Sequence, residues 1–86
     1  MKQDRLRVAV IGVGHLGEYH VQKYKAIPNV ELVGVVDTNP RRLKEIAQRH
    51  DVKGYGDYRE ILGLVDAVSL CVPTEKHFEV ARDVFP

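Results

Sequence analysis

The most telling segment of this chain reads Val8-Ala9-Val10-Ile11-Gly12-Val13-Gly14-His15-Leu16-Gly17. An apolar run typical of a β-strand leads into the glycine pattern G-x-G-x-x-G, and a helical pattern follows it. An acid, Asp37, stands at the end of the next apolar run, roughly 20 residues beyond the last glycine. The glycine pattern alone is weak, but strand, turn, helix and acid in this order predict a dinucleotide-binding site.

Each glycine has its own expected part in such a turn. Gly12 lets the chain turn sharply out of the strand, Gly14 lets a pyrophosphate approach the backbone, and Gly17 lets the helix pack closely on the strand. The amides around His15 and Leu16 would lie at the helix N-terminus, where unpaired N–H groups and the helix dipole favour an anion. The alternative is a glycine-rich turn without a ligand.

Asp37 bears on the choice of cofactor. Its carboxylate can accept hydrogen bonds from the adenosine ribose hydroxyls and would repel a 2′-phosphate, which favours NAD over NADP. Arg41 and Arg42 start the next helix and are close enough to reach a 2′-phosphate, although a solvated helix face also explains them. The alternative for Asp37 is an ordinary aspartate at the end of a strand.

The composition limits the class of protein. With 86 residues the chain is expected to form one domain over 1–86, and 13 basic against 12 acidic residues leave a net charge of +1. That balance gives no basic face for nucleic acid. No apolar stretch approaches the roughly 20 residues of a membrane span, and the polar start of the chain has no secretory pattern. A cytoplasmic protein without a nucleic-acid or membrane partner is expected.

Apolar runs alternate with helical patterns along the chain. Val30–Val36 is nearly all apolar and β-branched, as in a strand buried on both faces of a parallel sheet. Strand–helix alternation predicts an α/β fold, a three-layer α/β/α Rossmann-type parallel sheet of about four strands, incomplete relative to the full fold. The expected strands span 6–11, 30–36, 52–55 and 67–72, and the expected helices span 15–27 and 40–50, with a short one after 57 and a last one from 74.

Local signals mark where these helices begin. Asn39 can serve as an N-cap before Pro40, and Asp57 with Glu60 resembles a capping box. The short helix would carry apolar residues over 61–64, and a cap at Thr74 would start the last helix. In the first helix the predicted buried stripe consists of Leu16, His20, Tyr24 and Ile27.

Other polar residues have weaker signals. Pro73 and Thr74 leave the fourth strand at its carboxyl end, where ligands bind in open α/β sheets, and His77 follows in the last helix. Thr74 is explained equally by capping, and His77 by a surface position. His20 is predicted to pack in or near the core and His50 to act only as a helix C-terminal cation. The four histidines lack metal-ligand spacing, so no metal is predicted. Cys71 is read as a small buried hydrophobe.

These motifs together resemble the N-terminal domain of the Gfo/Idh/MocA oxidoreductases. The resemblance rests on the glycine motif followed by His20, on Glu31–Asp37, on Asp66-Ala67-Val68 and on Val72-Pro73-Thr74-x-x-His77, and it covers nearly the whole chain. It implies NAD(P)-dependent hydride transfer to or from a sugar, cyclitol or related polyol. By position, the three glycines would carry the pyrophosphate, Asp37 the ribose, and Pro73, Thr74 and His77 would lie near the nicotinamide.

The sequence also departs from the family pattern. Members carry a Glu-Lys-Pro motif after the last helix seen here, followed by a substrate domain, and neither is present. The chain alone is therefore expected to bind the cofactor without turning over a substrate, and the fourth strand to be an uncharged edge that favours a homo-oligomer through that edge or a helix face. The alternatives are a non-catalytic nucleotide-binding or redox-sensing module, or a Rossmann domain that binds another nucleotide.

Overall fold

The computed structural model describes residues 5–72. In chain order its elements are β1 (Leu6–Ile11), α1 (His15–Lys25), β2 (Val30–Val36), α2 (Pro40–His50), β3 (Gly54–Tyr55), the 3₁₀ turns η1 (Tyr58–Glu60) and η2 (Leu62–Leu64), and β4 (Ala67–Leu70). The predicted helix from Thr74 lies outside the described residues.

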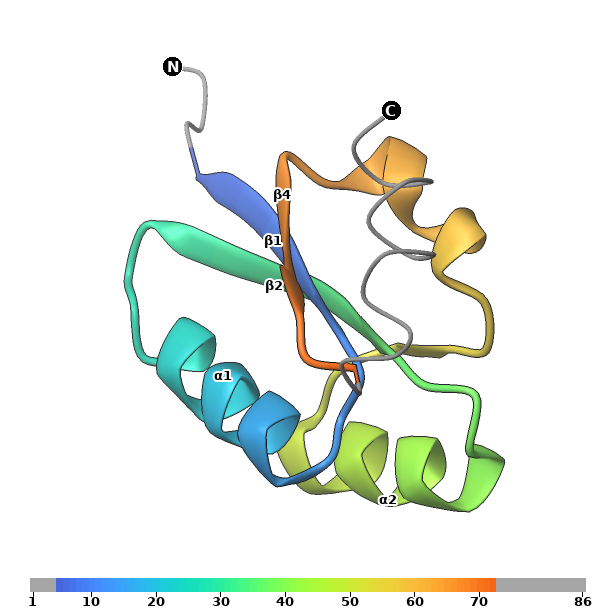
Figure 1. The fold of residues 1–86 in the computed structure, drawn as a ribbon. Coiled ribbons are helices and arrows are strands. Elements are labelled where there is room, and N and C mark those ends of the chain that lie inside the picture. Colours follow the sequence, from blue (N-terminus) through green and yellow to red (C-terminus); the bar gives the residue numbers. More distant parts are fainter. Residues whose placement is uncertain (1–4, 73–86) are drawn as a thin grey trace.

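The strands form one parallel sheet in the order β3-β2-β1-β4. The glycine-bearing strand β1 is therefore central, and its residues Val8 to Ile11 are at most 3% exposed. A strand buried on both faces needs cover on both. Helices α1 and α2 pack on one face, and the η1–η2 segment covers the other (Figure 1). The predicted Rossmann-type parallel α/β fold is confirmed.

Two apolar clusters hold these layers together. On the helical face Val21 of α1 and Ile46 of α2 pack against Val10 and Val35 of the sheet. On the other face Ile61, which is fully buried, packs against alternate residues of the same two central strands. Alternation along each strand sends successive side chains to opposite faces. The short η1–η2 segment thus covers apolar residues on one face of the sheet, as the two helices do on the other.

Helix α1 differs from the prediction in its end and in its buried stripe. It ends at Lys25 rather than Ile27, because the residue before Pro28 is disfavoured in a helical conformation. The buried residues of α1 are Gly17 and Val21, whereas Leu16 is 60% exposed and Ile27 43% exposed. Of the predicted stripe, His20 and Tyr24 are half-buried, whereas Leu16 and Ile27 at its two ends are exposed, because the helix packs on the sheet through Gly17 and Val21.

The segment after β3 forms two 3₁₀ turns rather than one helix. Asp57 does cap it, but its carboxylate accepts from the N–H of Arg59, whereas the Glu60 N–H bonds to the Asp57 carbonyl. The predicted capping box is therefore wrong, because it requires the Glu60 amide to bond to that side chain. Gly63 lies between the buried Ile61 and the exposed Leu64, and glycine disfavours helix continuation.

Strands β3 and β4 are both shorter than predicted, and the end of β4 bears on the site. Residue Leu70 pairs with Ile11, the last residue of β1, so pairing stops where β1 turns at Gly12. The amide of Cys71 adds one further bond to the Ile11 carbonyl, at 2.8 Å. A cleft lies beyond this point, at the carboxyl ends of the strands. None of the helices within residues 5–72 has the length and apolar character to cross a membrane.

Candidate functional site

A cleft of about 730 Å³ lies beyond the carboxyl ends of β1, β2 and β4. Its walls are the glycine turn and first turn of α1, the end of β2 with Asp37, the segment 56–59, and Cys71 with Val72. Ligands of open α/β sheets bind at this end of the strands. The cleft therefore stands where the sequence places a dinucleotide.

The three glycines of the turn have three different surroundings. Gly12 has φ +95°, and a Cβ there would lie 2.6 Å from the Cys71 carbonyl oxygen. A Cβ on Gly17 would collide with the carbonyl of Gly12. Around Gly14, by contrast, a Cβ would meet nothing within 4 Å, and Gly14 lines the cleft. Gly12 thus allows the turn, Gly17 allows the close packing of α1 on the turn, and Gly14 leaves the backbone open beside the cleft.

Helix α1 begins at the cleft without a side-chain cap. Gly14 is its N-cap residue and offers no side chain to the first amides, while His15 and Leu16 are exposed and line the cleft. The first N–H groups of a helix have no partner within the helix and carry its positive dipole end. This end of the cleft is therefore suited to an anion such as a pyrophosphate.

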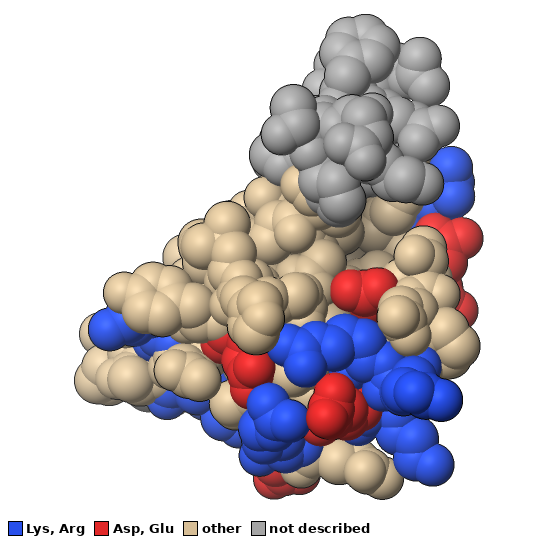
Figure 2. Space-filling view, turned by 60° about the horizontal axis from the view of Figure 1, so that its bottom comes forward, with Lys and Arg blue, Asp and Glu red and all other residues tan. Residues whose placement is uncertain are grey.

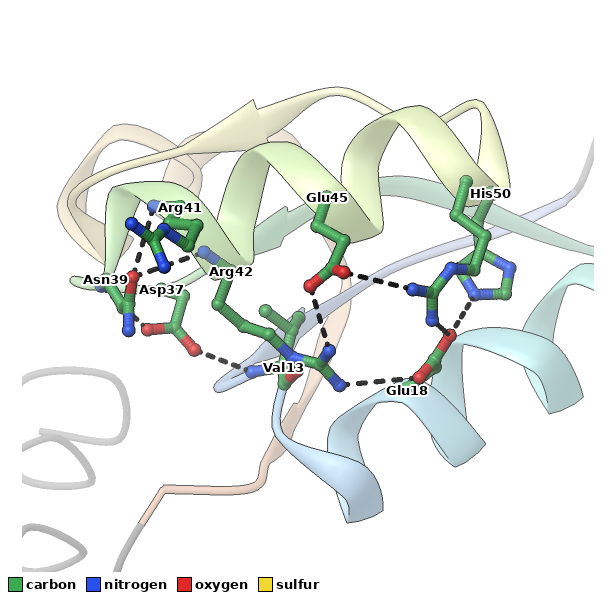
Figure 3. Close-up of polar contacts among 9 residues, drawn as sticks. Val13, Glu18, Asp37, Asn39, Arg41, Arg42, Glu45 and His50 are labelled. Atoms are coloured by element: carbon green, nitrogen blue, oxygen red, sulfur yellow. Dashed lines mark hydrogen bonds and ion pairs between the residues drawn. The ribbon is translucent and has the colours of Figure 1, made fainter.

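Asp37 ties the glycine turn to the loop before α2. One carboxylate oxygen accepts from the Val13 amide at 2.9 Å, and the other accepts from the Asn39 amide at 2.8 Å (Figure 3). Each oxygen of an ionised carboxylate can accept about two hydrogen bonds. Asp37 is half-buried and lines the cleft, so it can hold the turn in place and still accept from a ribose hydroxyl.

The two adjacent arginines lie in different environments. Arg42 donates from Nε to the Val13 carbonyl at 2.8 Å and forms ion pairs with Glu18 and Glu45. Arg42 is thus neither a solvated helix-face residue nor a ready ligand for a 2′-phosphate. Arg41 is exposed and does not line the described part of the cleft. Asn39 caps the helix as predicted, accepting from the Arg41 and Arg42 amides at 3.1 Å each.

Three basic side chains of α2 contact the Glu18 carboxylate. Its carboxylate contacts Arg49 at 2.6 Å, the His50 Nε2 at 2.8 Å and Arg42 at 3.4 Å. The hydrogen bonds from His50 and Arg49 lower the pKa of Glu18 from 4.5 to about 2. The prediction that His50 acts only as a helix C-terminal cation is therefore wrong, because it also bonds across to α1. Figure 2, in which the bottom of the Figure 1 view is turned forward, shows basic and acidic side chains intermixed on this side of the molecule.

The stability of the chain should depend on Glu18 ionisation. Because the folded-state pKa lies below 4.5, its stabilising contribution is present above about pH 4.5 and is lost as the pH falls toward about 2. We expect Glu18→Gln to lower the melting temperature by about 4–8 °C at neutral pH, with the difference vanishing near the lower pH. Thermal melts by circular dichroism measure this. An equal, pH-independent change in the exposed control Glu60→Gln would contradict it.

Sequence reasoning missed one wall of the cleft. Residues 56–59 follow β3 and line the cleft, with the Arg59 guanidinium 4.9 Å from the centre of the Tyr58 ring. Their signal was their position at the carboxyl end of a strand of a parallel sheet, the same signal that singled out Asp37. The shortness of β3 weakened that signal, since the end of the strand was hard to place.

Apart from Cys71, which lines the cleft, the remaining predicted residues fall outside the cleft or the described chain. Pro73, Thr74 and His77 lie outside the described residues. His20 is half-buried, as predicted, and its Nδ1 lies 3.2 Å from the Ser69 hydroxyl, which also bonds Tyr24 at 2.6 Å. Burial raises the pKa of the half-buried Cys71 thiol. Within residues 5–72 no group of three or more potential metal ligands comes together.

Comparison with known proteins agrees with this geometry. Residues 6–85 match the family described as "Oxidoreductase family, NAD-binding Rossmann fold", the Gfo/Idh/MocA family. This chain belongs to that family. The resemblance found in the sequence is thereby confirmed, and NAD is the cofactor that the family supports, as Asp37 predicted.

Individual relatives show the extent of the match. UDP-N-acetylglucosamine 3-dehydrogenase of Acidithiobacillus ferrooxidans is 46% identical over 77 residues, which are 90% of this chain and 24% of that protein. Myo-inositol 2-dehydrogenase of Thermotoga maritima is 35% identical over 87% of this chain and 23% of its own length. The structure of GenD2 from gentamicin A biosynthesis, in complex with NAD, has a TM-score of 0.88 and 32% identity over 94% of this chain and 24% of that one. The chain thus spans about a quarter of these Gfo/Idh/MocA relatives.

Proposed function

We propose that residues 1–86 form the NAD-binding domain of an oxidoreductase that transfers hydride between the nicotinamide and a sugar, cyclitol or related polyol. The family supports the cofactor, and relatives named for UDP-N-acetylglucosamine and myo-inositol support the substrate class. The observation that carries the proposal is the uncapped start of α1 opening on the same cleft as the Asp37 carboxylate. NAD offers an anion for the first and ribose hydroxyls for the second.

The residues present fit this cofactor at both points. The backbone at Gly12, Gly14 and Gly17, with the amides at His15 and Leu16, would hold the pyrophosphate, because Gly14 leaves the approach open. The Asp37 carboxylate would accept from the adenosine ribose hydroxyls. When bound, NAD supplies the carbon that exchanges hydride with the substrate.

Several finer assignments belong to the same proposal. Pro73, Thr74 and His77 would lie on the nicotinamide side, and the exposed Arg41 would serve NADP if the chain accepted it. Hydride transfer also needs a bound substrate and a base for its hydroxyl proton, so we do not expect these 86 residues alone to turn over a polyol. Oligomerisation through the β4 edge or a helix face and a cytoplasmic location stay predictions.

The proposed function is tested by titrating the chain with NAD and NADP. We expect NAD to bind more tightly than NADP, because the Asp37 carboxylate repels a 2′-phosphate. Asp37→Ala should lower the affinity for NAD about tenfold and that for NADP much less, since the repulsion is lost together with the ribose bonds. Isothermal calorimetry, with NMR titration for weak binding, gives both constants.

Matched variants separate the ribose contact from a general loss of charge. Glu31→Gln removes one negative charge from the exposed opposite end of β2 and should leave both affinities unchanged. Asp37→Asn keeps an oxygen for one of the two backbone amides and should bind NAD between the wild type and Asp37→Ala. Tighter binding of NADP than NAD by the wild type would overturn the cofactor assignment, and binding of neither would overturn the proposed function.

A further inference from the structure

The peptide groups around Val13 are held from two sides. The Val13 N–H donates to Asp37 at 2.9 Å, and the Val13 carbonyl accepts from the Arg42 Nε at 2.8 Å (Figure 3). The Val13 side chain is fully buried, which fixes the residue from a third direction. In the middle of a glycine turn, where the backbone is otherwise free to rotate, such anchoring leaves one arrangement of the peptide groups.

The Arg42 bond orients the peptide that carries the Gly14 amide, at the start of α1 beside the cleft. A trans peptide is planar, so the carbonyl of Val13 and the N–H of Gly14 point in opposite directions. With the carbonyl held toward Arg42, the Gly14 N–H is turned away from α2. Gly14 lines the cleft and its surroundings are open. The position of the Arg42 side chain therefore sets the direction of a backbone donor at the predicted pyrophosphate position.

Arg42 is itself held by acids on both helices. Its guanidinium lies 3.4 Å from Glu18 of α1 and 3.2 Å from Glu45 of α2, and its side chain is 26% exposed. Glu18 is 14% exposed and is fixed in turn by Arg49 and His50 at the end of α2. The guanidinium thus has its Nε on the turn and its two terminal nitrogens on carboxylates, which leaves it little freedom to turn toward a cofactor.

We propose that Arg42 and Glu18 are positioning residues of the dinucleotide site: Arg42 orients the Val13–Gly14 peptide, and Glu18 orients Arg42, without either touching the cofactor. The proposal rests on the proposed function, since it assigns these residues to the same NAD site. This role differs from direct binding of a phosphate by Arg42. A positioning residue affects every ligand that carries the pyrophosphate equally, whereas a 2′-phosphate ligand affects NADP alone.

The experiment measures the binding of NAD, NADP and adenosine to Arg42→Gln, Arg42→Lys and Glu18→Gln by NMR titration of the full chain. We expect Arg42→Gln to lower the affinities for NAD and NADP by the same factor, about fivefold. The affinity for adenosine, which lacks the pyrophosphate, should fall by less than about twofold. Arg42→Lys should not restore affinity, because one ammonium group cannot reach the carbonyl and both carboxylates with the geometry of a guanidinium. The control Lys44→Gln, an exposed charge loss on α2, should change nothing.

Two further readouts test the link through Glu18. Glu18→Gln should lower the affinities for NAD and NADP by the same factor. The double variant with Arg42→Gln should lose no more affinity than Arg42→Gln alone, because both residues act through one contact. In the absence of ligand, the Gly14 amide resonance should shift in all three single variants and not in Lys44→Gln. Glu18→Gln preserves the side-chain shape and keeps the test open if Arg42→Gln does not fold.

Each contrary result overturns a definite part of the proposal. A larger loss for NADP than for NAD would make Arg42 a phosphate ligand, and full affinity in Arg42→Lys would show that charge alone matters. An equal loss of affinity for adenosine and NAD would show that Arg42 only stabilises the fold. Failure of the wild type to bind NAD contradicts the proposed function instead, while an unmoved Gly14 resonance in the ligand-free Arg42 variants contradicts the positioning part.

Discussion

Replacing Gly17 with alanine is expected to destabilise this chain by about 3–4 kcal/mol, a large part of the roughly 5–15 kcal/mol that holds a domain folded. The new Cβ would collide with the Gly12 carbonyl oxygen and lie 2.8 Å from its carbon, both backbone atoms of the turn. These atoms are held in place, because the Val13 N–H of the same peptide donates to Asp37 at 2.9 Å and the Gly12 N–H donates to the Val36 carbonyl at 2.7 Å. In an unconstrained helix alanine would be the better residue by about 1 kcal/mol, so the sign of the effect itself reports the packing.

Urea and thermal unfolding followed by circular dichroism measure this loss. The matched control is Gly63→Ala, since a Cβ at Gly63 meets nothing within 4 Å and its φ is not positive. We expect that variant to lie within about 1 kcal/mol of the wild type. A Gly17→Ala chain that unfolds at the same urea concentration as Gly63→Ala would contradict the close approach of α1 to the turn.

The glycine turn could be predicted from the sequence because its requirements are local. A positive φ at Gly12, an open backbone at Gly14 and close packing at Gly17 each follow from one residue type at one spacing. The position of Asp37 could be predicted equally well, since an acid at the carboxyl end of one strand lies beside the turn after another when the two strands are neighbours in a parallel sheet, as β1 and β2 are. Its bond to the Val13 amide is the direct expression of that register.

The parts that could not be predicted depend on how two helices meet. Arg42 reaches Val13 only because α2 lies beside α1, and no spacing rule relates residues 29 positions apart. His50 was correctly placed at a helix end, but its partner Glu18 belongs to the other helix. Leu16 shows a different limit: it lies on the same stripe as the half-buried His20 and Tyr24, but the close contact of Gly17 with the turn leaves Leu16 itself exposed.

Replacing Gly14 with alanine should separate binding from folding at this same turn. Its backbone, with φ −70° and ψ −159°, is open to any residue, and a Cβ would meet nothing within 4 Å. We expect a stability loss below about 1 kcal/mol, from the poorer N-cap alone. The affinity for NAD should nevertheless fall about 100-fold, or about 2.7 kcal/mol, because the new methyl group stands where the pyrophosphate approaches the amides of α1.

Adenosine supplies the internal comparison for this variant. It lacks the pyrophosphate and should bind Gly14→Ala within about twofold of the wild type, since its ribose contact at Asp37 is unaffected. Parallel titrations of both ligands, with Gly63→Ala as the control off the cleft, measure the two constants on one scale. Equal NAD affinity in Gly14→Ala and the wild type would show that the pyrophosphate does not bind at the turn. The open side of Gly14 would then have to be explained by the capping of α1 alone, which leaves Asp37 as the one cofactor contact in the described cleft.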